Sequence, residues 1–254
     1  MPKKIVRKYT WRPDVPDHRD HLFIPELDAA ALPAHVDLRG QCPPVYDQGQ
    51  LGSCTGNAIA AAYSFAAHKE HLGLFFAPSR LFIYYNERAM EGTIKSDAGA
   101  MIRDGIKSIV KFGACSETTW PYKTTKFATK PTAKAFKEAL KHQALSYQRL
   151  TQTEHAMKAC LAAGFPFVFG FSVYESFESA EVAKTGMLNL PQHGEQMLGG
   201  HAVMAVGYDD AGERFLVRNS WGESWGLDGY FTMPYGYITN NNLADDFWTV
   251  RTTE

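Results

Sequence analysis

The 254-residue sequence predicts an α+β fold, with helices in the first half of the folded body and antiparallel strands in the second. Segments rich in Ala, Ile, Tyr and Phe with helical character recur up to residue 163. After Pro166 the pattern changes to short apolar or alternating segments bounded by Gly and Asp. The length suits one large domain or two small lobes. We therefore expect a helical lobe facing a strand-rich lobe across a ligand-binding cleft.

The expected helices begin at Ser53, a candidate N-cap that would put Cys54 in the first helical turn. Gly113 is expected to end the third helix. The expected helices cover 53–71, 79–90, 98–112, 132–142 and 153–163. The expected strands cover 167–173, 201–208, 214–220 and 229–233. We interpret 174–200 as a plain connection between strands.

Residues 1–36 differ in composition from the rest of the chain. They contain five prolines and the polar stretch W-R-P-D-V-P-D-H-R-D-H. Because proline fixes φ and lacks an N–H, this segment is predicted to be extended. The folded body then covers 37–254, divided into a mainly helical lobe, 37–125, and a mainly β lobe, 126–254.

The bulk composition excludes several function classes. A net charge of −1 gives no electrostatic argument for binding nucleic acid or an anionic membrane. No apolar run is long enough to cross a bilayer, and the basic start lacks the apolar core of a secretory signal peptide. We expect a cytoplasmic protein or one exported by a non-classical route.

The cysteine pattern indicates neither a disulfide framework nor a metal site. Cys42, Cys54, Cys115 and Cys160 are too few for such a framework in a chain of this length. No CxxC pair and no Cys/His cluster at zinc spacing occurs. We expect no cofactor and no metal.

Four residues have side chains suited to attack on a carbonyl carbon: Gln48, Cys54, His201 and Asn219. A thiol is a weak nucleophile until it becomes a thiolate, which the positive end of a helix favours. A histidine can take the thiol proton, and a polar group can hold the tautomer of that histidine. An amide donor can stabilise the resulting oxyanion.

The words around these residues resemble the papain-like cysteine peptidases over roughly 33–254. The resemblance is carried by D-Q-G-Q-L-G-S-C (47–54), W-P-Y (120–122), G-G-H-A-V (199–203) and N-S-W-G-E-S-W-G (219–226). It implies a two-lobe fold, a helical L lobe facing an antiparallel β-barrel-like R lobe, with the active-site cleft between them. It also implies hydrolysis of peptide or protein substrates through an acyl-enzyme. Cys54 would then be the nucleophile, His201 the general base and acid, Asn219 its orienting group and Gln48 the oxyanion donor.

The resemblance also implies substrate-binding positions. Ala98 and Gly99 match the stretch whose backbone pairs with an extended peptide. Gly170 and Ala202 fall where the family lines its main specificity pocket, and their small size suggests room for a bulky side chain. Trp221 would shield the Asn–His hydrogen bond from water.

Departures from the family pattern leave alternatives open. Thr55 replaces the usual aromatic neighbour of the nucleophile, and Leu51 replaces a disulfide-bonded cysteine, which fits a reducing compartment. The same chemistry would serve an exopeptidase, with 174–200 blocking one end of the cleft, or an amidase or transpeptidase. A catalytically idle binding protein is the remaining alternative. Residues 1–36 either act as an intramolecular inhibitor across the cleft or form a strap packed elsewhere.

Overall fold

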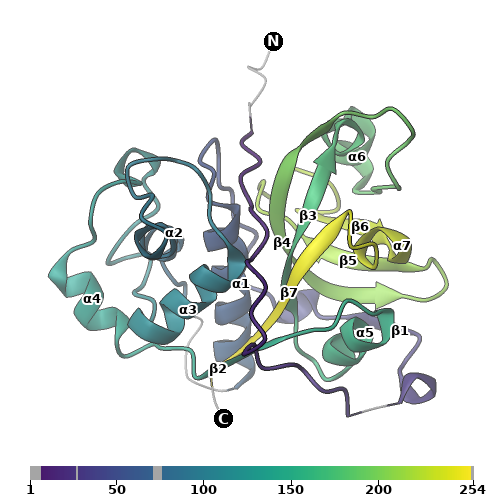
Figure 1. Ribbon diagram of the computed structural model, residues 1–254, viewed down its shortest axis with the longest axis horizontal. Coiled ribbons are helices and arrows are strands. Elements are labelled where there is room, and N and C mark those ends of the chain that lie inside the picture. The colour runs from purple at the N-terminus through teal and green to yellow at the C-terminus, as the bar shows by residue number, and fades with distance from the viewer. Residues whose placement is uncertain (1–6, 27, 71–75, 253–254) are drawn as a thin grey trace.

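The computed structural model describes residues 7–26, 28–70 and 76–252 and places helices on one side of the molecule and a twisted sheet on the other (Figure 1). The helical side contains α1 (Cys54–Lys69), α2 (Arg80–Met90), α3 (Ile102–Phe112) and α4 (Ala133–Ala139). The helices α5 (Glu154–Ala162), α6 (Ala180–Thr185) and α7 (Tyr235–Ile238) accompany the sheet. Short 3-10 turns cover Ala29–Ala31, Arg39–Gln41, Thr124–Lys126 and Glu175–Glu178.

The sheet is antiparallel throughout its described pairings and has the strand order β2-β7-β3-β4-β5-β6, with β1 added to β4. Its strands are β1 (His35–Asp37), β2 (Ser146–Arg149), β3 (Phe167–Tyr174), β4 (Met197–Asp209), β5 (Arg214–Arg218), β6 (Tyr230–Pro234) and β7 (Ala244–Arg251). The long strand β4 is the partner of β1, β3 and β5. The first part of β4, which includes His201, is therefore held by β3, and its last part by β5 and β1.

The α+β prediction is confirmed, and the structure also contains elements that were not predicted. The five expected helices and four expected strands form with bounds shifted by a few residues, and β4 begins four residues early, at Met197. The strands β1, β2 and β7 and the helices α6 and α7 were missed. The interpretation of 174–200 as a plain connection was wrong, since α6 lies within it. Residue 71, the expected end of the first helix, lies outside the described residues, as do residues 1–6, 27, 253 and 254. The proposed lobe boundaries stay a prediction.

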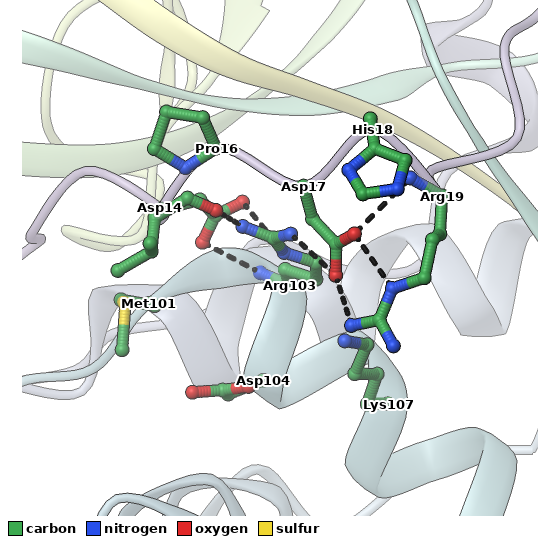
Figure 2. Close-up of a pocket in the computed structure, with 10 residues that line it drawn as sticks. Asp14, Pro16, Asp17, His18, Arg19, Met101, Arg103, Asp104 and Lys107 are labelled. Carbon is green, nitrogen blue, oxygen red and sulfur yellow. Dashed lines mark hydrogen bonds and ion pairs between the residues drawn. The ribbon is translucent and has the colours of Figure 1, made fainter.

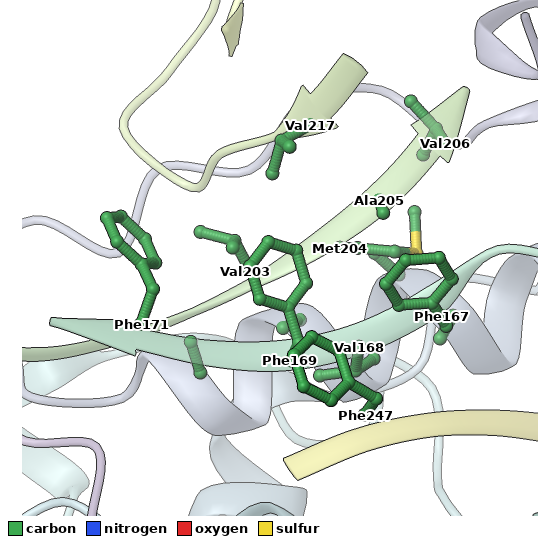
Figure 3. Close-up of a cluster of buried hydrophobic side chains, with 14 of the residues drawn as sticks. Phe167, Val168, Phe169, Phe171, Val203, Met204, Ala205, Val206, Val217 and Phe247 are labelled. Atoms are coloured by element: carbon green, nitrogen blue, oxygen red, sulfur yellow. The ribbon is translucent and has the colours of Figure 1, made fainter. Parts of the chain in front are cut away.

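The central helix α1 is buried on nearly all sides. Every residue from Cys54 to Ala67 is buried, because α1 packs against α2 and α3 on one side and against β4 and β7 on the other. The core of the sheet itself is aromatic: Figure 3 shows Phe167, Phe169 and Phe247 gathered at β3 and β7. Packing against helices on one side and strands on the other fixes the axis of α1, and with it the position of Cys54 at the helix start.

The N-terminal segment, defined here as residues 7–26, descends between the helical side and the sheet side (Figure 1). Its backbone bridges to β4 at Gly200 and to β2 at Arg149. Arg103 of α3 anchors it: the Arg103 N–H donates to Asp14, and the guanidinium lies 3.7 Å from Asp17 (Figure 2) and 3.3 Å from Asp20. The segment is thus held at several points along its length.

Candidate active site

Cys54 is the first residue of α1, and its side chain is fully buried. The predicted N-cap position, Ser53, is correct, but the hydroxyl of Ser53 does not cap the helix and instead lies 2.5 Å from the hydroxyl of Tyr122. Against the larger rise that burial causes, backbone groups of Ala202 on β4 and of Thr55 lie close enough to the Cys54 thiol to lower its pKa. The packing of α1 against β4 therefore brings the sulfur beside the strand that carries His201.

His201 lies in the middle of β4, and Asn219 directly follows β5. The Nε2 atom of His201 and the Oδ1 atom of Asn219 are 2.9 Å apart, and the backbone N–H of Ser220 donates to the same Oδ1 at 2.8 Å. Within the described part of the chain, the buried Nδ1 atom of His201 has no hydrogen-bond partner. Nδ1 is consequently the ring nitrogen left to exchange a proton with another group.

Gln48 is connected to the same network through Ser220. The backbone N–H of Gln48 donates to the Ser220 carbonyl at 2.9 Å, and the Ser220 hydroxyl donates to Oε1 of Gln48 at 2.6 Å. The Nε2 atom of Gln48 donates one hydrogen to the Leu51 carbonyl at 3.0 Å. Because an amide nitrogen carries two hydrogens, one donor remains for an oxyanion.

Aromatic side chains enclose the histidine. The ring centroid of Trp221 lies 5.2 Å from that of His201, and the ring centroid of Phe171 on β3 lies 5.9 Å from it. Trp221 is itself buried. These neighbours exclude water from the His201–Asn219 hydrogen bond, which strengthens it.

The N-terminal segment covers this arrangement. The Thr10 hydroxyl donates to the carbonyl of Gly52, two residues before Cys54, at 2.8 Å. Trp11 donates its backbone N–H to the Gly200 carbonyl at 2.9 Å. Tyr9 packs edge-on against His201, with ring centroids 6.2 Å apart. Residues 9–11 therefore lie directly over the predicted catalytic residues.

The same segment contacts the positions expected to bind substrate. A Cβ atom added to Gly99 would lie 1.9 Å from the carbonyl oxygen of Thr10, and one added to Gly170 would lie 1.9 Å from the Trp11 ring. Trp221 has the guanidinium of Arg7 4.0 Å above its ring. Ala98 sits between Gly99 and Asp97, and Asp97 accepts a hydrogen bond from Lys8 at 2.6 Å. Ala202 is buried on β4 and pairs with Gly170 on the neighbouring strand β3.

Burial beneath the segment favours the neutral forms of both predicted catalytic side chains, Cys54 and His201. Loss of water raises the pKa of the Cys54 thiol to about 11, although hydrogen bonds oppose the rise. Burial lowers the pKa of His201 to about 4, against the hydrogen bond to Asn219, and the nearby Arg7 adds to the lowering. The predicted stabilisation of a thiolate at the helix start is outweighed by burial while the segment lies in place.

Sequence reasoning missed three contributors. Ser220 links Gln48 to Asn219, and its place in the word N-S-W-G was the available signal. Trp11 is a large apolar residue in an otherwise polar, proline-rich stretch, which is unusual for a solvated segment. Asp246 accepts a hydrogen bond from the Trp11 indole at 3.2 Å, and no local pattern in the sequence pointed to it.

Over the described ranges, no three His, Cys, Asp or Glu side chains are grouped so that they could hold a metal ion. The same part of the chain contains no helix with the length and apolar character needed to cross a membrane.

Comparison with known proteins gives concordant results. A sequence model described as papain family cysteine protease matches residues 32–249. A peptidase C1-like protein of Acanthamoeba polyphaga mimivirus is 52% identical over 214 residues, which are 81% of this chain and 68% of the relative. The cathepsin B-like protein CP2 of Giardia intestinalis is 32% identical over 222 residues, 82% of this chain and 71% of the relative. The crystal structure of xylellain, a cysteine protease from Xylella fastidiosa, superposes with a TM-score of 0.92 at 47% identity, covering 97% of this chain and 96% of that one.

Proposed function

Because this chain belongs to the papain family of cysteine proteases, we propose that it hydrolyses peptide bonds through a thiolate on Cys54 and an acyl-enzyme. The observation that carries the proposal is the His201–Asn219 hydrogen bond, held beside the start of α1 by β4 and Ser220. This bond fixes which nitrogen of His201 faces away from Asn219.

The chemical steps follow from these positions. Nδ1 of His201 takes the proton of the Cys54 thiol, and the sulfur forms a bond to the substrate carbonyl carbon. The free hydrogen of the Gln48 amide and the backbone N–H of Cys54 stabilise the oxyanion. As the C–N bond breaks, His201 returns its proton to the leaving amine. Water, deprotonated by His201, then cleaves the thioester and releases the acid product and the thiol.

We further propose that the N-terminal segment is an intramolecular inhibitor. Three contacts support it: Thr10 occupies the space over Cys54, Tyr9 covers His201, and Trp11 fills the space above Gly170. Inhibition would act both by excluding substrate and by keeping thiol and imidazole neutral. A thiol at neutral pH with a pKa near 11 contains almost no thiolate.

Both proposals are tested by cutting the folded chain. A recognition sequence for a specific protease, inserted between the exposed residues Ala30 and Ala31, allows the segment to be severed after folding. The cut removes the covalent link that keeps the segment at high local concentration. Fluorogenic peptides are then offered to intact and cut protein under reducing conditions, with Cys54→Ala as the inactive control.

We expect cleavage by the cut protein, at least tenfold less by the intact protein, and none by either form of Cys54→Ala. Equal rates before and after cutting would disprove inhibition but leave the peptidase standing. An absence of cleavage by cut protein whose Cys54 still reacts with iodoacetamide would disprove peptide-bond hydrolysis.

A narrower task, exopeptidase activity, has one observation in its favour. Within 174–200, Glu178 accepts a hydrogen bond from Tyr9 at 2.6 Å, and Tyr9 in turn covers His201 and Trp221. That segment therefore lies close to one end of the site. Rates on peptides with blocked and with free ends distinguish the two tasks, since an exopeptidase requires one free end.

A further inference from the structure

The site occupied by Trp11 has room for an indole because two strands carry glycine there. A Cβ atom at Gly170 would lie 1.9 Å from the Trp11 ring, and one at Gly200 would lie 2.6 Å from it. The Trp11 side chain is correspondingly buried, with 8% of its surface exposed. We call this place, bounded by Gly170, Gly200 and Asp246, the Trp11 site.

The polar end of the Trp11 site is a single carboxylate. Asp246 on β7 is fully buried, and its Oδ2 atom accepts from the Trp11 indole at 3.2 Å and from the Asp14 N–H at 2.8 Å. Both donors belong to the N-terminal segment. When the segment leaves, Oδ2 loses both donors and is left facing the vacated site.

The other oxygen of Asp246 already has a cation nearby. Oδ1 lies 3.5 Å from the guanidinium of Arg149 on β2. Arg149 also pairs with Asp245 at 3.0 Å and with Asp20 at 3.5 Å. Of these carboxylates, Asp20 leaves with the segment and Asp245 stays. The charge of Asp246 is thus partly balanced from the protein side without any substrate.

We propose that Asp246 is a specificity-determining residue that makes the Trp11 site select tryptophan side chains in substrates. The inference rests on the proposed peptidase function. Thr10 contacts Cys54, so the next residue along, Trp11, marks a site one residue from the reacting sulfur. An extended peptide bound over Cys54 places a side chain in that site.

Chemistry distinguishes tryptophan from the other large side chains. Phenylalanine fills the space but offers no donor, which leaves a buried carboxylate oxygen unpaired. Arginine offers donors but brings a second cation toward Arg149 in a site sheltered from water. Tryptophan supplies a flat ring over Gly170 and one N–H directed at Oδ2, as Trp11 does.

The experiment varies the substrate first. The cut protein is given peptide libraries in which one position before the scissile bond is held constant, each position in turn. The constant residue is Trp, benzothienylalanine, Phe or Arg. Benzothienylalanine keeps the shape of tryptophan and replaces its N–H by sulfur. We expect kcat/KM for Trp to exceed that for benzothienylalanine about tenfold at one position, and to exceed that for Arg as well, a tenfold change being about 1.4 kcal/mol.

The protein is varied next. Asp246→Ala is expected to reduce the Trp-to-benzothienylalanine ratio to within about twofold of unity. Asp246→Asn keeps an oxygen acceptor and tolerates the φ of +61° at this position, so the ratio is retained within about threefold. Asp245→Ala is the matched control: it removes a neighbouring carboxylate that also pairs with Arg149 but does not touch Trp11.

A binding measurement separates failure of this inference from failure of the peptidase proposal. Cut Cys54→Ala protein, freed of its own segment, is titrated with a synthetic peptide of residues 7–20 carrying Trp or benzothienylalanine at position 11. Tighter binding of the Trp peptide by about tenfold supports the inference even if no hydrolysis occurs. The inference would be overturned if peptides with Trp and with benzothienylalanine were bound equally and cleaved equally, or if peptides with Arg were preferred.

Discussion

At the residue after the nucleophile, a buried hydrogen bond replaces the aromatic packing that the resemblance led us to expect. The Thr55 hydroxyl donates to Oε1 of Glu87 at 2.5 Å, and both side chains are fully buried. Burial raises the pKa of Glu87 well above its usual value, which favours the neutral form of the carboxyl group. Thr55 satisfies one oxygen of this acid under the first turn of α1.

Thr55→Val should therefore destabilise the protein although it fits the same space. Removing the hydroxyl leaves the Glu87 carboxyl without this donor, which costs about 1–3 kcal/mol. Thr55→Ser keeps the hydroxyl and is the control. The free energy of unfolding is measured by urea denaturation. If Val and Ser destabilise equally, the hydrogen bond is not what Thr55 contributes.

Gly170 gives a second prediction at the same scale. Gly170→Ala places a methyl group within 1.9 Å of the Trp11 ring, so the ring must leave its site. We expect iodoacetamide to label Cys54 in the intact variant at least tenfold faster than in the wild type. Gly236→Ala, where an added methyl has nothing within 4 Å, should label at the wild-type rate. Unchanged labelling in Gly170→Ala would contradict the role of Trp11 in holding the segment.

At the scale of elements, the sequence predicted the helices and strands whose own residues follow a regular apolar pattern. The helices α1–α5 and the strands β3–β6 followed from composition and from alternating or continuous apolar runs. Strand β7 was missed because its sequence, A-D-D-F-W-T-V-R, has two acidic residues directly after the first position. One of them, Asp246, is buried by contacts with Trp11 and Asp14, which lie more than 200 positions away. Such tertiary contacts are absent from a local window of sequence.

The candidate site shows the same division. The four candidate catalytic positions were singled out because each stands in a distinctive stretch of sequence, and the structure brings Gln48, His201 and Asn219 into one hydrogen-bonded network through Ser220. Whether residues 1–36 crossed this network or packed elsewhere could not be decided from an extended, proline-rich pattern. That choice depends on Trp11 fitting over Gly170, a property of two distant segments together.

The N-terminal segment should bind less tightly to the rest of the protein as the pH rises. Burial and the adjacent Asp14 raise the pKa of Asp246 to about 8 with the segment in place, and burial also raises the pKa of Asp14. Arg149 opposes this rise, Asp245 adds to it, and Arg103 lowers the pKa of Asp14. The closed form therefore binds more protons than the released form. The free energy that holds the segment in place is therefore largest below the pKa that these acids have after release. It decreases as the pH rises toward 8 and is constant above that pH.

Amide hydrogen exchange of residues 9–14 measures this closure once the intrinsic pH dependence of exchange is divided out. We expect protection to fall between pH 5 and pH 8. Asp246→Asn should remove most of the slope, and Asp245→Asn should keep it. Constant protection over this range, or protection that rises with pH, would show that the carboxylate pair does not control the segment.

At the scale of the whole molecule, the proposed reacting pair lies where the two sides of the protein meet. Cys54 begins α1 on the helical side and His201 lies on β4 of the sheet side, and the N-terminal segment runs between these two sides (Figure 1). Under the inhibition that we propose, this placement would let one segment control both substrate access and the ionisation of the two side chains. With the segment bound, the pKa of Cys54 is raised to about 11 and that of His201 lowered to about 4, mainly by burial. A thiolate–imidazolium pair becomes favourable only when water and the helix start can stabilise the charges.

Severing the segment should therefore shift the pH dependence of Cys54 alkylation as well as its rate. In the intact protein we expect iodoacetamide labelling at pH 6 to be slow and its midpoint to lie above pH 8, because the buried thiol stays protonated. After cutting between Ala30 and Ala31, the midpoint should fall below pH 7, and labelling at pH 6 should rise about 100-fold or more. Mass spectrometry assigns the label to Cys54, and Cys42, which the cut leaves half-buried under other elements, reports any general loosening. A rate that rises while the midpoint stays fixed would mean that the segment acts only as a steric cover and leaves the ionisation of the pair unchanged.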